Sequence, residues 1–167
     1  MTINRIGVYG GTFDPIHNGH LAVSRAVLEN FGLDLLLIVP AGRPPHKRTV
    51  SVSDSYHRYT LAVLATMDTA RALVSTIEIE QPELPYTYQT LERLRERYES
   101  ASLFFILGSD SFEELHAWRE PLRILRMANI IVAARPGYEM QNNQLLRMLC
   151  ENESQSKAGD PQNEVDA

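Results

Sequence analysis

The sequence predicts an α/β protein in which helices cover both faces of a mainly parallel β-sheet. Short apolar runs, such as LFFIL at 103–107, are typical of strands that are buried on both faces. These runs alternate along the chain with segments whose apolar residues recur at helical spacing. The 167 residues are enough for one domain with a substantial core. We expect that domain to span residues 1–150 and a polar, disordered tail to follow at 151–167.

The first strand is expected at 5–9, where the apolar run RIGVY is closed by two glycines. A helix is predicted from about Gly19 to Phe31. Gly32 is placed to end this helix in a left-handed conformation, because glycine has no Cβ to oppose it.

The second strand is expected at 35–39, a continuous apolar run that Pro40 ends. A proline-containing basic loop, AGRPPHKR at 41–48, follows it. Ser53 is a candidate N-cap for the next helix. The apolar face of that helix is predicted to comprise Tyr56, Thr60, Val63, Leu64 and Met67.

Further strands are expected at 73–79, 103–107 and 129–134, with a helix capped by Thr87 before the second of them. One more helical pattern lies at 142–149. Alternating strands and helices of this kind predict a Rossmann-like, doubly wound fold.

The charge of the chain narrows its possible partners. The formal net charge is −5, and most of it lies in the tail, which argues against a general nucleic-acid-binding protein. The basic residues gather instead at 43–48, as a site for a compact anion requires. The sequence contains neither a secretion signal nor an apolar run long enough to cross a membrane, and its only cysteine is Cys150. We therefore expect a cytoplasmic protein that does not bind membranes.

The segment GGTFDPIHNGH at 10–20 carries most of the functional information. It lies between the first strand and the first helix, where an open α/β sheet binds its ligand. Gly10 and Gly11 let a polyphosphate approach the backbone, and the helix start offers free N–H groups. His17 and His20 fall on one face of the first turn, where each can donate to a phosphate oxygen. An ordinary tight turn followed by two incidental histidines is the alternative, but the combination favours a phosphate site.

This segment resembles the signature of the nucleotidyltransferases with the HxGH motif, which transfer a nucleotidyl group from a nucleoside triphosphate. The histidine at position 17 is similar to that of the nicotinate-nucleotide adenylyltransferases, whereas pantetheine-phosphate adenylyltransferases commonly have threonine there. Further similar segments follow in order: Pro44-Pro45-His46-Lys47, His57-Arg58, Pro85-Tyr86-Thr87, Gly108-Ser109-Asp110-Ser111, Trp118 and Ala134-Arg135-Pro136-Gly137. The family's late Ile-Ser-x-Thr-x-Ile-Arg motif has no match in this sequence.

The resemblance implies that AMP passes from ATP to nicotinate mononucleotide, giving nicotinate adenine dinucleotide and pyrophosphate in NAD biosynthesis. His17 and His20 are then the catalytic residues. The implied ATP site comprises Gly10, Gly11, Thr12, Phe13, His17, His20, Gly108, Asp110 and Arg135. The implied mononucleotide site comprises Thr12, Lys47, Tyr86, Thr87, Trp118 and Arg119. Mg²⁺ is expected to arrive with ATP, because the motif offers no cluster of carboxylates that would hold a metal.

Several of these residues also have an ordinary structural interpretation. Asp110 either binds a ribose hydroxyl or adenine amine, or caps the helix that follows it. Trp118 either stacks on a pyridine ring or packs in the core. Asp14 is expected to shape a turn rather than to face a metal, and His57 and Arg58 are expected to be mainly structural. Lys47 and Arg135 are phosphate ligands in the one interpretation and surface residues in the other.

Other functions stay open on the sequence alone. Nicotinamide mononucleotide differs from the acid by one charge, and phosphopantetheine is a more distant acceptor. A nucleotide-binding module without turnover is a further alternative, because the late phosphate-binding motif has no match. The sequence does not determine the oligomeric state.

Overall fold

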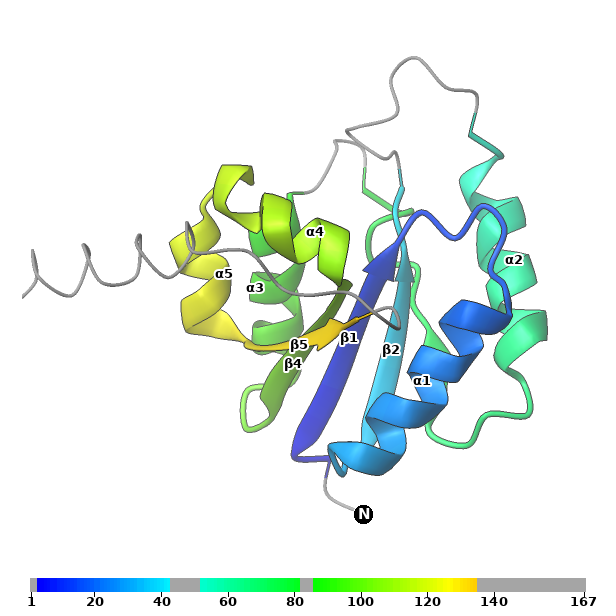
Figure 1. Cartoon of the computed structure of the whole chain (residues 1–167), viewed down its shortest axis with the longest axis horizontal. Coiled ribbons are helices and arrows are strands. Elements are labelled where there is room, and N and C mark those ends of the chain that lie inside the picture. Colours follow the sequence, from blue (N-terminus) through cyan, green and yellow to red (C-terminus); the bar gives the residue numbers. More distant parts are fainter. Residues whose placement is uncertain (1–2, 43–51, 82–85, 135–167) are drawn as a thin grey trace, which may run out of the picture.

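The computed structural model describes residues 3–42, 52–81 and 86–134 (Figure 1). In this part of the chain, five strands form one parallel sheet in the order β3-β2-β1-β4-β5. The strands are β1 (Arg5–Gly11), β2 (Leu35–Pro40), β3 (Ala72–Val74), β4 (Ser102–Gly108) and β5 (Asn129–Ala133). The predicted Rossmann-like α/β sheet is confirmed.

The helices connect these strands. They are α1 (Asn18–Asn30), α2 (Ser55–Thr66), α3 (Thr87–Arg97), α4 (Ser109–Glu114) and α5 (Pro121–Met127), with a 3₁₀ turn at Leu115–Ala117. Gly32 has φ +55°, so the left-handed end predicted for the first helix is confirmed. None of the helices in the described ranges has the length and apolar character needed to cross a membrane.

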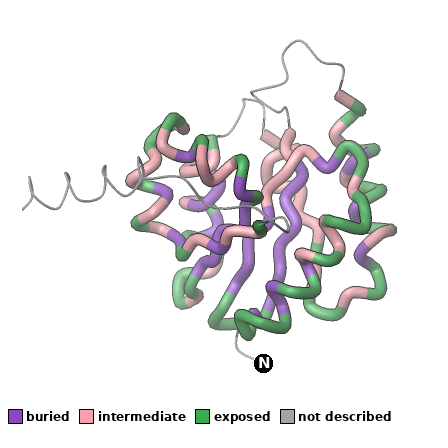
Figure 2. The backbone as a smooth tube through the Cα atoms, in the orientation of Figure 1, coloured by how far each residue is buried: buried purple, intermediate pink, exposed green. Residues whose placement is uncertain are grey.

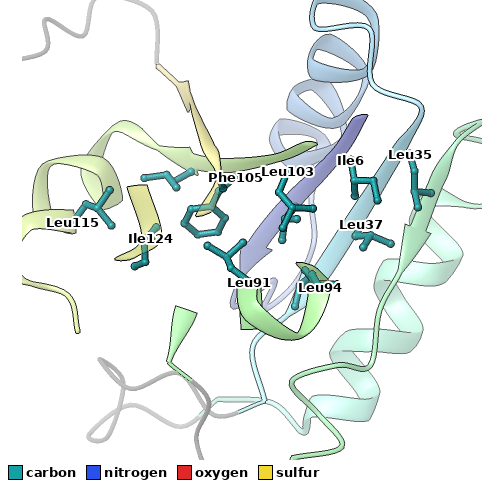
Figure 3. Close-up of a cluster of buried hydrophobic side chains, with 13 residues drawn as sticks. Ile6, Leu35, Leu37, Leu91, Leu94, Leu103, Phe105, Leu115 and Ile124 are labelled. Carbon is teal, nitrogen blue, oxygen red and sulfur yellow. The ribbon is translucent and has the colours of Figure 1, made fainter. Parts of the chain in front are cut away.

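The central strands consist largely of buried residues (Figure 2). Their side chains form two separate core clusters, one on each face of the sheet. On one face, Leu91 and Leu94 of α3 and Ile124 of α5 pack against alternate residues of β1, β2 and β4 (Figure 3). On the other face, Val27 and Leu28 of α1 pack against the intervening residues. The continuous apolar runs in the sequence follow from this burial, because every side chain of a central strand meets a helix layer.

Helix α2 presents a different face to the protein from the one predicted. The predicted apolar face (Tyr56, Thr60, Val63, Leu64 and Met67) is exposed, and the buried residues are Arg58, Ala62 and Thr66. These three residues are four positions apart and so share one face. The small side chains of Ala62 and Thr66 allow a close approach to β2 and β3. The N-cap residue is Asp54 and not Ser53, the residue that the sequence predicted. The carboxylate of Asp54 accepts hydrogen bonds from the amides of Tyr56 and His57.

Two other boundaries differ from the sequence prediction. The strand expected at 73–79 ends at Val74, since Ile79 and Glu80 donate to the Thr76 carbonyl and close a turn. Thr87 is the first residue of α3, and Tyr86 occupies the N-cap position. The helix predicted at 142–149 and the tail at 151–167 lie outside the described residues.

Candidate active site

The candidate site lies at the carboxyl edge of the sheet, where β1 and β4 end side by side. Tyr9 of β1 pairs with Ile106 of β4, and both strands end two residues later, at Gly11 and Gly108. The chain continues from β1 towards β2 on one side and from β4 towards β5 on the other. A doubly wound sheet opens a ligand crevice where its connections diverge in this way. The two glycine turns that the sequence singled out therefore meet at the expected binding edge.

His17 and His20 lie against each other at the start of α1. Their rings are stacked, with centroids 3.7 Å apart and an interplanar angle of 27°. The backbone N–H of His17 donates to Nδ1 of His20 over 3.2 Å. Because Nδ1 of a neutral His20 accepts this bond, its proton resides on Nε2, which becomes the available donor.

His20 is half-buried in an aromatic setting. The edges of Tyr9 and Phe13 meet its ring at centroid distances of 6.1 and 5.0 Å. Burial, and to a smaller extent the neighbouring His17, lower the pKa of His20 to about 4. His20 is therefore a neutral hydrogen-bond donor at physiological pH.

Phe13 supports this arrangement from the core. Its side chain is 2 % exposed, and its backbone has φ 47°, a left-handed conformation that is uncommon for a residue with a bulky side chain. A Cβ on Gly11 would lie 2.9 Å from the Phe13 ring, so the packing of Phe13 requires glycine there. Because the Phe13 side chain is buried, only its backbone could meet a ligand. Asp14 accepts from the amide of Ser53, in agreement with the structural role expected for it.

Gly19 has a role that the sequence analysis did not assign. A Cβ at this position would lie 3.1 Å from the His17 ring. The absence of a side chain therefore gives His17 room to stack on His20. The position of Gly19 in the motif, between the two histidines, is the feature of the sequence that could have indicated this role.

Gly108 and Asp110 are both exposed at the start of α4. Gly108 is the N-cap residue, and Asp110 is in the first turn of the helix. Asp110 is therefore not the N-cap residue of α4, although a carboxylate in a first turn interacts favourably with the helix dipole. The role of Asp110 towards ATP remains a prediction.

A second group of predicted residues surrounds the start of α3. The Arg119 guanidinium lies over the ring of Tyr86, 5.8 Å from its centroid, and Thr87 follows at the first position of α3. Trp118 packs edge-on against Phe105, with centroids 6.3 Å apart. Its Nε1 is buried and has no hydrogen-bond partner in the described part of the chain. Lys47 and Arg135 lie outside the described residues.

Two buried polar side chains near this edge were not assigned to the site from the sequence. Arg58 is 1 % exposed and donates to backbone carbonyls of the surrounding loops. Glu78 accepts from the Thr90 hydroxyl over 2.9 Å and from the Gly42 amide. Burial raises the pKa of Glu78 to about 7, although both hydrogen bonds oppose the rise. No motif marks Glu78, whereas Arg58 belongs to the His57-Arg58 segment.

Within the described ranges, no three histidine, cysteine, aspartate or glutamate side chains gather closely enough to hold a metal ion. The site offers a ligand hydrogen-bond donors, namely the backbone N–H groups at the start of α1 and the Nε2–H of His20. Donors of this kind suit a phosphate.

Comparison with known proteins identifies the family of the chain. The model of the cytidylyltransferase-like family matches residues 8–158. A probable nicotinate-nucleotide adenylyltransferase of Tropheryma whipplei (strain TW08/27) is 45 % identical over 131 residues, which cover 78 % of this chain and 69 % of that protein. One of Thermoanaerobacter sp. (strain X514) is 44 % identical over 136 residues, covering 81 % and 64 %. The chain thus spans about two thirds of the length of these curated relatives.

Solved structures agree on the fold. The nicotinic acid mononucleotide adenylyltransferase of Plasmodium falciparum in complex with APC has a TM-score of 0.71 at 20 % identity, covering 86 % of this chain and 70 % of that one. The same enzyme in complex with NaAD has a TM-score of 0.67 at 19 % identity, covering 81 % and 77 %. The chain therefore belongs to the cytidylyltransferase-like family and, within it, to the nicotinate-nucleotide adenylyltransferases.

Proposed function

We propose that the chain transfers AMP from ATP to nicotinate mononucleotide and releases pyrophosphate. The observation that carries this proposal is the stacked pair of His17 and His20 at the start of α1, with Nε2 of a neutral His20 as donor. The names of the curated relatives support the same reaction.

The reaction requires alignment more than proton transfer. The 5′-phosphate of the mononucleotide is already anionic at neutral pH, so it attacks the α-phosphorus without a strong base. The bond from the α-phosphorus to the bridging oxygen breaks, and the electron pair leaves with pyrophosphate. The protein must place the attacking oxygen in line and stabilise the leaving charge.

His20 and His17 supply that stabilisation in our proposal, with His20 at the α-phosphate and His17 at the β-phosphate. The Nε2–H of a neutral His20 donates to a phosphate oxygen without any change in the charge of the ring. Its hydrogen bond strengthens as negative charge grows on the phosphate. The free N–H groups at the start of α1 act in the same direction. Gly10, Gly11 and the Thr12 and Phe13 backbone complete the phosphate side, with Gly108, Asp110 and Arg135 towards the rest of ATP.

Mg²⁺ is proposed to enter as part of the ATP substrate. This suits the residues present, since the described part of the chain offers no cluster of metal-ligating side chains. An ion bound to phosphate oxygens and water supplies charge neutralisation at the leaving group.

The acceptor is proposed to bind between Trp118 and the start of α3. Trp118 would stack on the pyridine ring, and its Nε1, which has no hydrogen-bond partner in the described part of the chain, is proposed as a donor to a polar group there. Thr87 would offer a hydroxyl and a helix-start N–H to the pyridine carboxylate, and the backbone of Arg119 a second N–H. Tyr86 is proposed to border the same site, and Lys47 to bind the phosphate.

The test is pyrophosphate release from Mg-ATP in the presence of nicotinate mononucleotide, nicotinamide mononucleotide or phosphopantetheine. We expect release with nicotinate mononucleotide, reduced about 10²–10³-fold in His20→Ala. His57→Ala, which removes an exposed histidine on α2, is the matched control and should stay near wild type. ATP binding without release for any acceptor would instead favour a nucleotide-binding module, the function suggested by the unmatched late motif.

A further inference from the structure

Arg58 joins three loops at the carboxyl edge of the sheet. From its position on α2, its Nη1 donates to the Thr12 carbonyl over 2.6 Å and its Nη2 to the Ala41 carbonyl over 2.7 Å. Nη2 also donates to the Gly42 carbonyl over 3.2 Å, and Nε donates to the Ser53 carbonyl over 2.9 Å. The guanidinium thus lies between the loop after β1, the loop after β2 and the segment before α2.

Only arginine supplies these donors in one rigid plane. Its five N–H groups have a fixed fork geometry, whereas lysine carries a single ammonium on a flexible stem. The contacts are made by a side chain that is 1 % exposed, so water cannot replace them. Losing the guanidinium would leave buried carbonyls of separate loops without a common partner.

The loop after β2 is also held on its other side. The Gly42 amide donates to Glu78, and a Cβ on Gly42 would lie 2.5 Å from the Glu78 carbonyl oxygen. The amide of Ala41 donates to the Gly11 carbonyl over 2.8 Å. Position 42 is therefore fixed from both directions, immediately before the basic stretch 43–48 of the sequence.

We propose that Arg58 is a positioning residue for adenylyl transfer, and that it fixes the phosphate loop (residues 10–17) relative to the loop after β2. This inference rests on the proposed function, in which the triphosphate binds to the phosphate loop. The Arg58 contacts then set the position of this loop, and of the triphosphate on it, relative to Ala41 and Gly42. Misplacement of reacting groups by about 1 Å costs on the order of 10²-fold in rate.

The test compares Arg58→Lys with Arg71→Lys. Arg71 also donates to a backbone carbonyl, that of Leu33 over 2.7 Å, but at the opposite edge of the sheet. We expect Arg58→Lys to lower kcat about 10–100-fold at saturating substrates while KM for ATP changes little. Arg71→Lys should keep the wild-type kcat. A folded Arg58→Lys protein with wild-type kcat, or one that loses only thermal stability, overturns the inference.

Hydrogen exchange separates this inference from the proposed function. In Arg58→Lys the amides of Ala41 and of the phosphate loop should exchange faster than in wild type and in Arg71→Lys. Unchanged exchange overturns the positioning role even if the wild-type protein has no turnover. A wild-type protein without pyrophosphate release, together with faster exchange in the variant, rejects the proposed reaction and leaves the fixing of the loops by Arg58 supported.

Discussion

His20 is held in one tautomer and one charge state by its surroundings. The His17 amide donates to Nδ1, and the aromatic contacts of Tyr9 and Phe13 shield part of the ring from water. The sequence predicted that the two histidines share one face, because their spacing fixes it. It did not predict the neutral state of His20, which depends on a Phe13 side chain buried through a left-handed backbone.

The charge state of His20 can be measured directly. With a pKa of about 4, its ring should show no titration between pH 5 and 8, where an ordinary histidine titrates. An ATP analogue should raise the pKa of His20, because phosphate charge stabilises the protonated ring. NMR of the ring protons, with His20→Ala for assignment, measures both effects. A midpoint near 6.5 in the free protein would contradict our description of the site.

Gly19→Ala should separate stability from activity. Alanine is favoured over glycine in a helix by about 1 kcal/mol, so thermal stability should stay equal or increase. The added Cβ would lie 3.1 Å from the His17 ring, so the ring must shift by a few tenths of an ångström from its stacked position on His20. We therefore expect kcat to fall while Tm does not. Thermal denaturation and pyrophosphate release on the same sample decide this, and an unchanged kcat would show that the stacking is dispensable.

Helix α2 shows where an element cannot be oriented from its apolar pattern. Its large apolar residues point to solvent, and its inner face carries an arginine with two small residues. Apolar periodicity assumes that the core side of a helix is apolar, but here the inner side includes Arg58, which donates to carbonyls of three loops. The strands were more predictable, because burial on both faces leaves few polar positions.

Paired substitutions test this orientation of α2. Leu64→Gln replaces an exposed side chain and should change the free energy of unfolding by less than about 0.5 kcal/mol. Ala62→Leu adds volume at a fully buried position and should cost about 1–3 kcal/mol. Urea denaturation measures both. A larger loss of unfolding free energy in Leu64→Gln than in Ala62→Leu would indicate that the face predicted from the sequence is the buried one.

The molecule as a whole brings distant segments together at one edge of the sheet. The parallel order of the strands explains why Gly11 and Gly108 meet there, and this much followed from the alternation of strands and helices. The contacts of Arg58 and Glu78 did not follow, because they join segments that are far apart in the sequence and bind mainly backbone groups. A hydrogen bond to a backbone group does not depend on the side chain at that position, so the sequence has no pattern that predicts it.

Glu78 makes the stability of the whole fold depend on pH. A pKa raised from 4.5 to about 7 means that the folded protein binds a proton that the unfolded chain has lost, so stability falls as pH rises through that window. The full effect is at most about 3 kcal/mol. Glu78→Gln should lack this fall and gain stability relative to wild type between pH 4.5 and 7. Urea denaturation at several pH values measures the difference, and parallel curves would contradict it.

Adenylyl transfer to nicotinate mononucleotide can be tested by identifying the product. Mg-ATP is incubated with the protein and equal amounts of nicotinate and nicotinamide mononucleotide, and the dinucleotide formed is identified by mass spectrometry. We predict nicotinate adenine dinucleotide as the main early product, with pyrophosphate in equal amount, and both reduced about 10²–10³-fold in His20→Ala. A product containing only nicotinamide, or no dinucleotide despite bound ATP, would contradict the claim.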